Sequence, residues 1–317
     1  MRPLRLVPRD TRIRFVALTR LFIAVSLAAV VASAGLFLVR GLNLGIDFLG
    51  GTMIEVQTPG PADLGRMRGV LGGLGLGEVA LQEFGAPDDV LIRVARQPGG
   101  EKAQMKAVAV IKQALAGMGE GAMSYRRVEF VGPKVSGELV EAGIIAVISA
   151  VIAMLVYIWF RFEWQFSIGA VLALIHDVAL TIGMFSLTAI EFNLASIAAI
   201  LTIVGYSIND TVVVYDRVRE NLRKFKAMPM GDLLDLSINQ TLARTTMTSL
   251  TTLLALFALY FFGGEVIAGF TLAMIWGVVV GTYSSVFIAA PMLLWLQPVR
   301  GEGREKAAGT GEARSGP

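Results

Sequence analysis

The sequence contains no cysteine and only one histidine, His176, in its 317 residues. Without cysteine there can be no disulfide bond, thiolate metal site, iron–sulfur cluster or cysteine nucleophile. One histidine cannot build a multi-histidine metal site, so no metal or other cofactor is expected. Charged residues are also scarce, at 17% of the chain against about 25% in an average soluble domain. The formal net charge of +3 gives no reason to expect nucleic acid as a partner.

Long hydrophobic stretches, in contrast, are abundant: hydrophobic residues make up 55% of the chain, and its mean hydropathy is +0.65. A helix that crosses a membrane needs about 20 apolar residues. The stretches that meet this length are Phe15–Val39, Leu139–Phe160, Phe166–Leu187, Phe192–Tyr215, Leu242–Phe262 and Val266–Leu296. The last is long enough to include a surface turn around Pro291. The sequence therefore predicts a polytopic α-helical membrane protein with six transmembrane helices.

The first stretch also has features of a cleavable signal peptide. It follows an arginine-rich start and contains Ala32-Ser33-Ala34 as a candidate cleavage site. Its apolar run of about 25 residues, however, is longer than a signal core of about 7–15 residues. An uncleaved membrane anchor is therefore favoured.

Outside the long polar segment 40–137, lysine and arginine flank the predicted spans on one side only. They lie in the N-terminal segment, at Arg161, between residues 217 and 226, and in the C-terminal tail, whereas the turns Ala189–Asn193 and Gly263–Glu265 have none. Because positive charge marks the cytoplasmic side, both termini are expected in the cytoplasm. The chain then divides into a basic N-terminus (1–14), a first helix (15–39), a periplasmic domain (40–137), helices two to six (138–297) and a disordered cytoplasmic tail (298–317).

The periplasmic segment has the residue pattern of a small α/β domain. Its predicted strands are Gly51–Thr58, Val79–Phe84, Val90–Ala95 and Tyr125–Val131, and its predicted helices are Pro61–Leu74 and Glu101–Met118. This βαββαβ order is typical of a ferredoxin-like domain. The glycine-rich stretch 72–77 follows a helix and precedes a strand, the reverse of a dinucleotide-binding fingerprint. It is interpreted as a turn, and no nucleotide site is predicted.

Charged residues within the apolar stretches are the candidate functional residues, because a charge at a helix centre costs about 2.5–3.5 kcal/mol on insertion scales. Asp210 and Arg244 both lie about 26 Å from the outer ends of their helices, at 1.5 Å per residue, so the two could pair. Alternatively, Arg244 simply extends its charge to the cytoplasmic interface. Asp177 is expected either to form a polar node with His176 or to support packing between helices.

Polar neighbours extend both candidate sites. Asn209 stands beside Asp210, and Thr245 beside Arg244, so these residues together with His176 and Asp177 define a candidate secondary polar site. The Thr/Ser-rich run Thr245–Thr252 is more typical of hydrogen bonds between helices than of a proton path. Small residues such as Gly183 and Gly205 are expected to permit close helix contacts.

Several motifs in one fixed order resemble a single family. They are Gly45–Thr52, Val131–Val135, His176-Asp177, Gly205–Thr211, Asp216–Asn221, Thr241–Thr245 and Phe262–Gly264. Together with six spans and one outer domain, this set resembles SecF, the smaller partner in the SecD–SecF membrane complex of bacterial protein export. Within the first motif, Asp47, Gly50 and Gly51 are expected to form either a hinge or, as favoured here, an Asx-type turn that leads into the first strand.

The resemblance implies a non-enzymatic subunit of the cytoplasmic (inner) membrane that forms half of an RND-type helix bundle, completed by an obligatory SecD-like partner. The complex would act with the SecY translocon, with YajC as a further candidate partner. It would use the proton-motive force to promote late translocation of unfolded precursor proteins. In the family, the positions that match Asp210 and Arg244 lie at the proton-conducting interface with SecD.

Three other classes remain as alternatives. A small-solute exporter of the RND superfamily would carry about twice as many spans, unless it dimerised. An intramembrane aspartyl protease could be imagined with a carboxylate dyad of Asp177 and either Asp210 or Asp216. It would need a Gly-x-Gly-Asp motif, however, and none is present near Asp210. A membrane assembly scaffold without proton chemistry would make Asp210 and Arg244 dispensable.

Overall fold

A computed structural model describes residues 11–118 and 123–298, which form two compact units. The helical unit contains the described residues up to 41, 149–189 and those from 198 onward, and the sheet unit contains 42–148 and 190–197. Most of the predicted N-terminal segment 1–14 and of the predicted tail 298–317 lies outside the described residues. The sheet unit is larger than the predicted domain 40–137, because it also includes the beginning of the next helix and the turn at 190–197.

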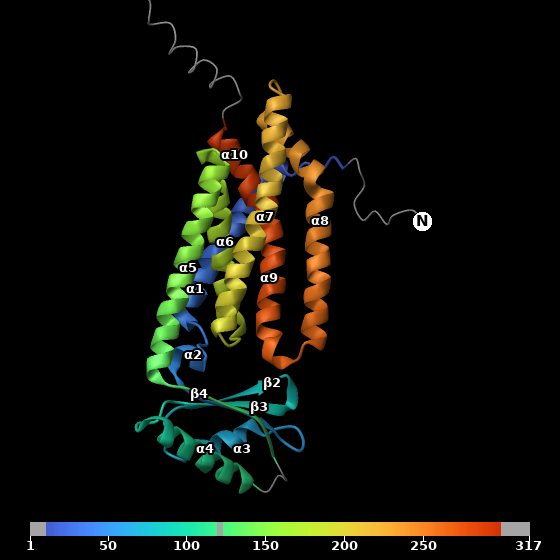
Figure 1. Cartoon of the computed structure of the whole chain (residues 1–317). Coiled ribbons are helices and arrows are strands. Elements are labelled where there is room, and N and C mark those ends of the chain that lie inside the picture. The colour runs from blue at the N-terminus through green and yellow to red at the C-terminus, as the bar shows by residue number, and fades with distance from the viewer. Residues whose placement is uncertain (1–10, 119–122, 299–317) are drawn as a thin grey trace, which may run out of the picture. The chain divides into compact units, whose positions relative to one another are not determined.

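The six predicted membrane helices are confirmed within the described part of the chain (Figure 1). They are α1 (Thr19–Arg40), α5 (Pro133–Arg161), α6 (Trp164–Thr188), α7 (Leu194–Lys224), α8 (Met230–Phe262) and the pair α9 (Ala268–Ser284) and α10 (Ala290–Leu296). Three of them are longer than predicted, since α5 begins at Pro133 before Leu139, α7 continues past Tyr215 and α8 begins before Leu242. The added turns of α8 are amphipathic and bury Leu233 and Leu234, so a search for continuous apolar runs does not detect them.

The last span differs from its prediction near Pro291. A surface turn was expected there, but Pro291 is buried in the first turn of α10. Ahead of it, Ser285–Ala289 form a π-helical turn that joins α9 to α10. The prediction of a surface turn is wrong because proline is tolerated in the first turn of a helix, where its missing N–H leaves no hydrogen bond unmade.

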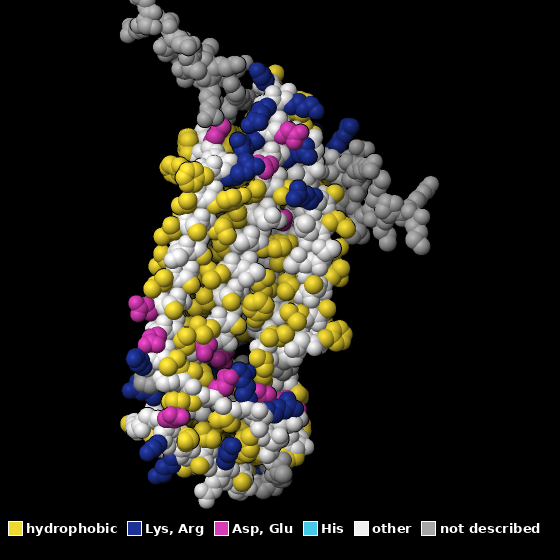
Figure 2. Space-filling model, viewed as in Figure 1, with side chains coloured by type: hydrophobic (Ala, Val, Ile, Leu, Met, Phe, Trp, Pro, Cys, Tyr) yellow, Lys and Arg dark blue, Asp and Glu magenta, His cyan; other side chains and the backbone are white. Residues whose placement is uncertain are grey.

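The surface of the helical unit is largely hydrophobic. Leu38, Phe160 and Phe262 are each more than 80% exposed, and Figure 2 shows hydrophobic side chains along the helices, with lysine and arginine gathered where α7 leads into α8. An apolar surface of this extent requires cover by lipid or protein. The chain is therefore a multi-pass membrane protein.

Two glycines one helical turn apart set the contact between α9 and α7. A Cβ atom on Gly277 would collide with the side chain of Ile203, and one on Gly281 would lie 3.0 Å from the Cβ of Ser207. Glycine spaced in this way lets helix backbones approach closely. The predicted role of Gly183 is also confirmed, because a Cβ there would overlap a residue of α1.

The sheet unit contains a four-stranded antiparallel sheet in the order β2-β3-β1-β4. Its elements are β1 (Gly51–Gln57), α3 (Leu64–Gly72), β2 (Val79–Phe84), β3 (Ala86–Val94), α4 (Gly100–Ala116) and β4 (Ser124–Val131). Both helices cover the same face of the sheet (Figure 1), where Ile54 and Ile92 pack in one buried cluster with Met67 and Ile111. The predicted βαββαβ order and ferredoxin-like fold are confirmed.

One strand boundary and one helix were not predicted. Residues 85–88 were expected to be a turn, but β3 already begins at Ala86, because Gly85 with a φ of +80° reverses the chain on its own. A register shift at Glu83 and Phe84 accommodates this tight connection. The one-turn helix α2 (Ile46–Leu49) precedes β1 and was missed, since four residues are too few for a periodic pattern.

Candidate functional site

Asp210 lies inside α7 and is 2% exposed. The side chain of Thr282 on α9 lies next to its carboxylate. The carboxylate oxygen Oδ2 is buried and has no hydrogen-bond partner among the described residues. A buried carboxylate with an unpartnered oxygen is costly in its ionised form and has a free position at which to accept a proton.

Arg244 lies on α8, and its side chain is exposed. Its charge is near enough to interact with that of Asp210. Within the described chain, however, no ion pair of 4.0 Å or less joins the two residues. A direct pair between Asp210 and Arg244 therefore stays a prediction, and the exposed guanidinium is open to a further chain.

Hydroxyl groups connect the surroundings of Asp210 across three helices. Ser249 of α8 lies 2.6 Å from the Thr282 hydroxyl and accepts a hydrogen bond of 3.3 Å from Tyr206 of α7. Elsewhere in the predicted Thr/Ser-rich run, Thr248 and Thr251 donate to carbonyls of their own helix. Ser249 thus confirms in part the expected hydrogen bonding between helices. Thr282 was missed by sequence reasoning, although the polar run 282–285 in a very apolar span was a signal.

Asp177 and His176 come together in a second, fully buried cluster. The Nδ1 atom of His176 lies 2.9 Å from Asp177 Oδ1. The Oδ2 atom accepts hydrogen bonds of 2.5 Å from Ser207 on α7 and 2.8 Å from Ser284 on α9. Three helices therefore converge on one carboxylate that is 0% exposed.

The other two members of the predicted secondary polar site do not join this cluster. Asn209 is exposed, and Thr245 is buried on α8 with its hydroxyl unpartnered among the described residues. No hydrogen bond in the described part of the chain links either residue to Asp177 or His176. The four residues do not form a single site, because Asn209 lies on an exposed side of α7 and the Thr245 hydroxyl makes no hydrogen bond to the cluster.

No carboxylate dyad is formed by the three aspartates considered for proteolysis. Asp216 is half-exposed and accepts two hydrogen bonds of 2.7 Å from Arg161. Asp177 and Asp210 each have the separate partners given above. Among the described residues there is also no group of three or more His, Asp or Glu side chains that could hold a metal ion.

The glycine motif lies at the start of β1 in the sheet unit. Gly50 and Gly51 have φ angles of +68° and +124°, which favour glycine. A Cβ on Gly51 would lie 2.5 Å from the carbonyl oxygen of Val94. The carboxylate of Asp47 accepts a hydrogen bond of 3.0 Å from the backbone N–H of Leu194. The predicted Asx-type turn at Asp47 is wrong, because this carboxylate binds a distant segment instead of its own backbone.

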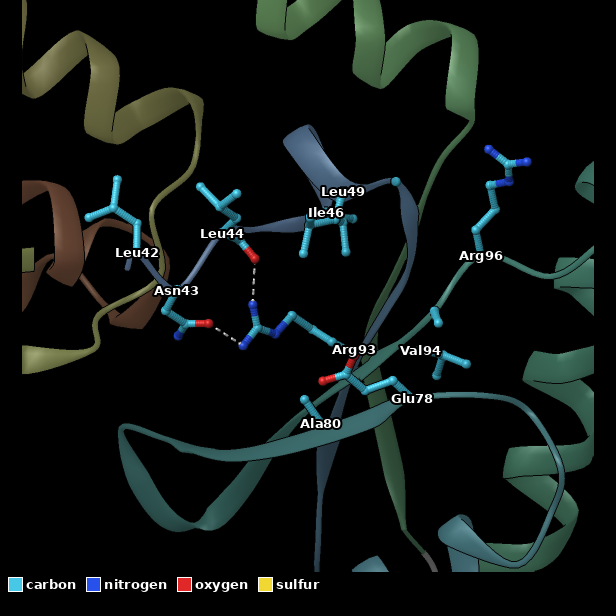
Figure 3. A pocket seen from close by; sticks show the side chains of 12 residues that line it. Leu42, Asn43, Leu44, Ile46, Leu49, Glu78, Ala80, Arg93, Val94 and Arg96 are labelled. Atoms are coloured by element: carbon cyan, nitrogen blue, oxygen red, sulfur yellow. Dashed lines mark hydrogen bonds between the residues drawn. The ribbon is translucent and has the colours of Figure 1, made fainter. Parts of the chain in front are cut away.

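The turn at 190–197 is attached to the segment before the glycine motif by backbone hydrogen bonds. Gly45 donates to the Phe192 carbonyl at 2.9 Å, and Phe192 donates to the Asn43 carbonyl at 2.8 Å. From the sheet, Arg93 of β3 donates to the Leu44 carbonyl at 2.8 Å and to Asn43 Oδ1 at 2.7 Å (Figure 3). Asn43, Leu44 and Arg93 border a pocket of about 470 Å³. The segment 42–45 is thus held from both sides.

Glu191 stands in this turn among several charges. Burial raises the pKa of Glu191; the charge of Arg93 opposes this shift, and the negative charges of Asp47 and Glu129 add to it. Its side chain also fills the space that a Cβ on Gly45 would need. Ionisation of Glu191 therefore lowers the free energy of unfolding relative to the protonated form.

Replacing Glu191 by glutamine should stabilise the protein at high pH and have little effect at low pH. Because the pKa of Glu191 is higher in the folded than in the unfolded protein, its contribution to stability is present at low pH and is lost as the pH rises through the folded pKa. We expect E191Q to melt a few degrees above wild type at pH 8, with a difference that shrinks toward pH 5. Thermal unfolding of the purified full chain in detergent measures this. E83Q, at an exposed position of β2, is the control, and a stabilisation independent of pH would contradict the prediction.

Comparisons with known proteins agree on one family. The model of the C-terminal region of the protein export membrane proteins SecD and SecF matches residues 110–299, and the SecD/SecF GG motif matches residues 35–58. The protein translocase subunit SecF of Rickettsia akari is 48% identical over 92% of this chain and 94% of its own length. The SecF subunit of Cereibacter sphaeroides is 45% identical over 97% of both chains.

Two solved structures are also similar. The crystal structure of SecDF from Thermus thermophilus, a translocon-associated membrane protein, has 36% identity and a TM-score of 0.83 over 93% of this chain. SecDF in a super-membrane-facing form has 32% identity and a TM-score of 0.65 over 99% of it. This chain spans only 40% and 42% of the length of those two chains.

Six membrane helices with buried carboxylates, and a ferredoxin-like insertion after the first of them, define a membrane protein of the protein-export class. Within that class, the chain belongs to the SecF family of protein translocase subunits.

Proposed function

We propose that this chain uses the proton-motive force, together with a SecD partner, to promote late translocation of precursor proteins across the cytoplasmic membrane. The observation that carries the proposal is the buried Asp210 carboxylate, whose Oδ2 atom has no partner among the described residues. Burying a carboxylate in an apolar helix costs free energy, so a carboxylate at such a position is taken first as a functional residue. Uptake and release of a proton at Asp210, with the nearby Arg244 charge as its counterpart, would drive rearrangement of the helices.

An obligatory SecD partner follows from the size of the chain and from its surface. The similar SecDF structures are more than twice as long as this chain, so a second subunit would supply the missing half of the bundle. Helix α8 carries Arg244 and exposes Leu254 and Phe261, which is the composition expected of a face covered by other helices. SecY and YajC would join the same assembly, and unfolded precursor chains would be its cargo.

The expected location is the cytoplasmic (inner) membrane, with both termini in the cytoplasm and the ferredoxin-like domain in the periplasm. The distribution of lysine and arginine supports this orientation: Arg217, Arg223 and Lys224 lie at the end of α7 that continues into α8, whereas the turns at the opposite helix ends lack positive charge.

Reconstitution tests the function directly. Vesicles with the translocon and a stalled precursor would receive this chain alone, the SecD partner alone, or both, with and without an imposed proton gradient. Completion of translocation should accelerate with the gradient only when both are present. Full gradient-driven activity of the chain alone would overturn the requirement for a partner. Equal stimulation with and without the gradient would favour a scaffold, and drug efflux by a homodimer would favour a small-solute exporter.

Arg244 provides a separate prediction about charge. Replacing it by methionine should lower gradient-driven translocation by about tenfold, since a paired charge of this kind is expected to carry a coupling of about 1–3 kcal/mol. Lysine at the same position should restore part of the activity, because it keeps the positive charge without the guanidinium geometry. The measurement is the translocation rate of the assembled complex in vesicles. Equal rates for R244M and wild type would show that Arg244 only extends its charge to the interface.

A further inference from the structure

The cluster at Asp177 is not used by the mechanism proposed for Asp210. Its carboxylate is 0% exposed, and its hydrogen-bonding groups come from α6, α7 and α9. Among the described residues, His176 is the titratable side chain that is hydrogen-bonded to it. The Nε2 atom of His176 is buried without a partner among the described residues. Two titratable side chains therefore share one buried site.

The hydroxyl of Ser284 has two acceptors for its single hydrogen. It lies 2.8 Å from Asp177 Oδ2 and 3.1 Å from the carbonyl oxygen of Gly281 in its own helix. If Asp177 is ionised, Ser284 donates to the carboxylate. If a proton is bound at Oδ2, the carboxyl group becomes the donor there, and Ser284 can turn its hydrogen to Gly281 without losing a hydrogen bond. The site thus accommodates both protonation states.

Three successive residues of α9 link this cluster to the rest of the bundle. Thr282 lies next to Asp210, and Ser284 donates a hydrogen bond to Asp177. Between them, the ring of Tyr283 lies against His176, with centroids 6.0 Å apart, and its hydroxyl lies 2.8 Å from Ser26 of α1. A rotation or shift of α9 would change both carboxylate sites together.

An irregular part of the helix adjoins these three residues. The π-helical turn Ser285–Ala289 begins directly after Ser284. π-turns are rare and are often found at functional sites. The hydroxyl groups on α9 therefore stand next to a feature that is typical of functional sites.

We propose that Asp177 is a second proton-accepting carboxylate of the transport cycle, and that Thr282 and Ser284 on α9 couple its protonation to that of Asp210. This proposal rests on the proposed proton-driven function. The dyad of Asp177 and His176 carries a net charge of −1 without the proton and 0 with it, wherever in the dyad the proton resides. Proton binding at one carboxylate alters its bond to α9, and the helix transmits the change to the other.

Substitutions at three positions test the coupling in the assembled complex with the SecD partner. D177N keeps the shape of the side chain but cannot take up a proton. S284A removes the hydroxyl with two acceptors. S285A is the matched control, because the Ser285 hydroxyl donates only to the Thr282 carbonyl of its own helix. Co-purification with the partner and thermal unfolding confirm that each variant is assembled before any activity is compared.

Two readouts are then measured: gradient-driven translocation, and the pH-dependent infrared band of protonated carboxyl groups. We expect D177N to reduce gradient-driven translocation by about tenfold, in the range of coupled sites, and to remove one titrating carboxyl band. S284A should shift the titration of the band assigned to Asp210, whereas S285A should match wild type.

The outcomes separate this proposal from the proposed function. If assembled D177N translocates normally and keeps every titrating band of wild type, Asp177 serves only packing and the proposal is overturned, even where D210N is inactive. If D210N itself keeps gradient-driven translocation, the proposed function fails first. If D177N loses the Asp177 band but S284A leaves the titration of the Asp210 band unshifted, the coupling through α9 is overturned.

Discussion

Replacing Asp210 by asparagine should abolish the gradient-dependent part of translocation while the complex with SecD still assembles. Asparagine has nearly the same volume and keeps a hydrogen-bond acceptor next to Thr282, the neighbour of Asp210 on α9. It cannot bind and release a proton at physiological pH, so the loss should be at least about tenfold, beyond the effect expected of a single neutral hydrogen bond. Translocation in vesicles with and without an imposed proton gradient measures the effect.

The control for this substitution is D232N, which removes an exposed carboxylate in the first turn of α8. It should leave gradient-driven translocation close to the wild-type rate. Because D210N also relieves the burial of a charge, its melting temperature should be equal to or above that of wild type. An assembled D210N complex with normal gradient-driven translocation would refute a proton-carrying role for Asp210.

The sequence identifies Asp177 and Asp210 because an ionisable residue in an apolar helix is conspicuous whatever surrounds it. The same reasoning could not identify Thr282 or Ser284, since serine and threonine are common in membrane helices and usually bond to their own backbone. Their role depends on how α9 is rotated against α7, which is determined by packing. Sequence reasoning therefore identifies ionisable residues in apolar helices reliably, because their burial costs free energy. It does not identify the neutral hydroxyl groups around them.

A similar limit applies in the sheet unit. The order of its strands and helices follows from local patterns, and the glycine motif from its unusual composition. The bond from Asp47 to Leu194 spans 147 positions and has no local signal. The four-residue helix α2 is equally hidden, because it completes only one turn. Predictions from sequence hold best where one residue, or one periodic run, determines the structure by itself.

Enlarging Gly277 should have the second large effect, through the contact between α7 and α9. A methyl group at this position would overlap the side chain of Ile203, so the helices must separate or rotate. Overpacking of a well-packed interior costs about 1–3 kcal/mol. Since the same contact places Ser207 beside Asp177 and Thr282 beside Asp210, we expect G277A to lower the melting temperature and to reduce gradient-driven translocation as well.

A second substitution and a matched control make this prediction specific. Truncating Ile203 to alanine in the G277A background should recover part of both losses, because the atoms that the new methyl group overlaps are removed. The control is G35A on α1, where an added Cβ meets no atom within 4 Å; it should behave as wild type. If I203A only created a cavity, it would lower the melting temperature of G277A further. That result would show that the added methyl group does not clash with Ile203. If it restored stability without activity, Ile203 itself would be needed to hold α7 in its register, and the two carboxylate sites would depend on its full side chain.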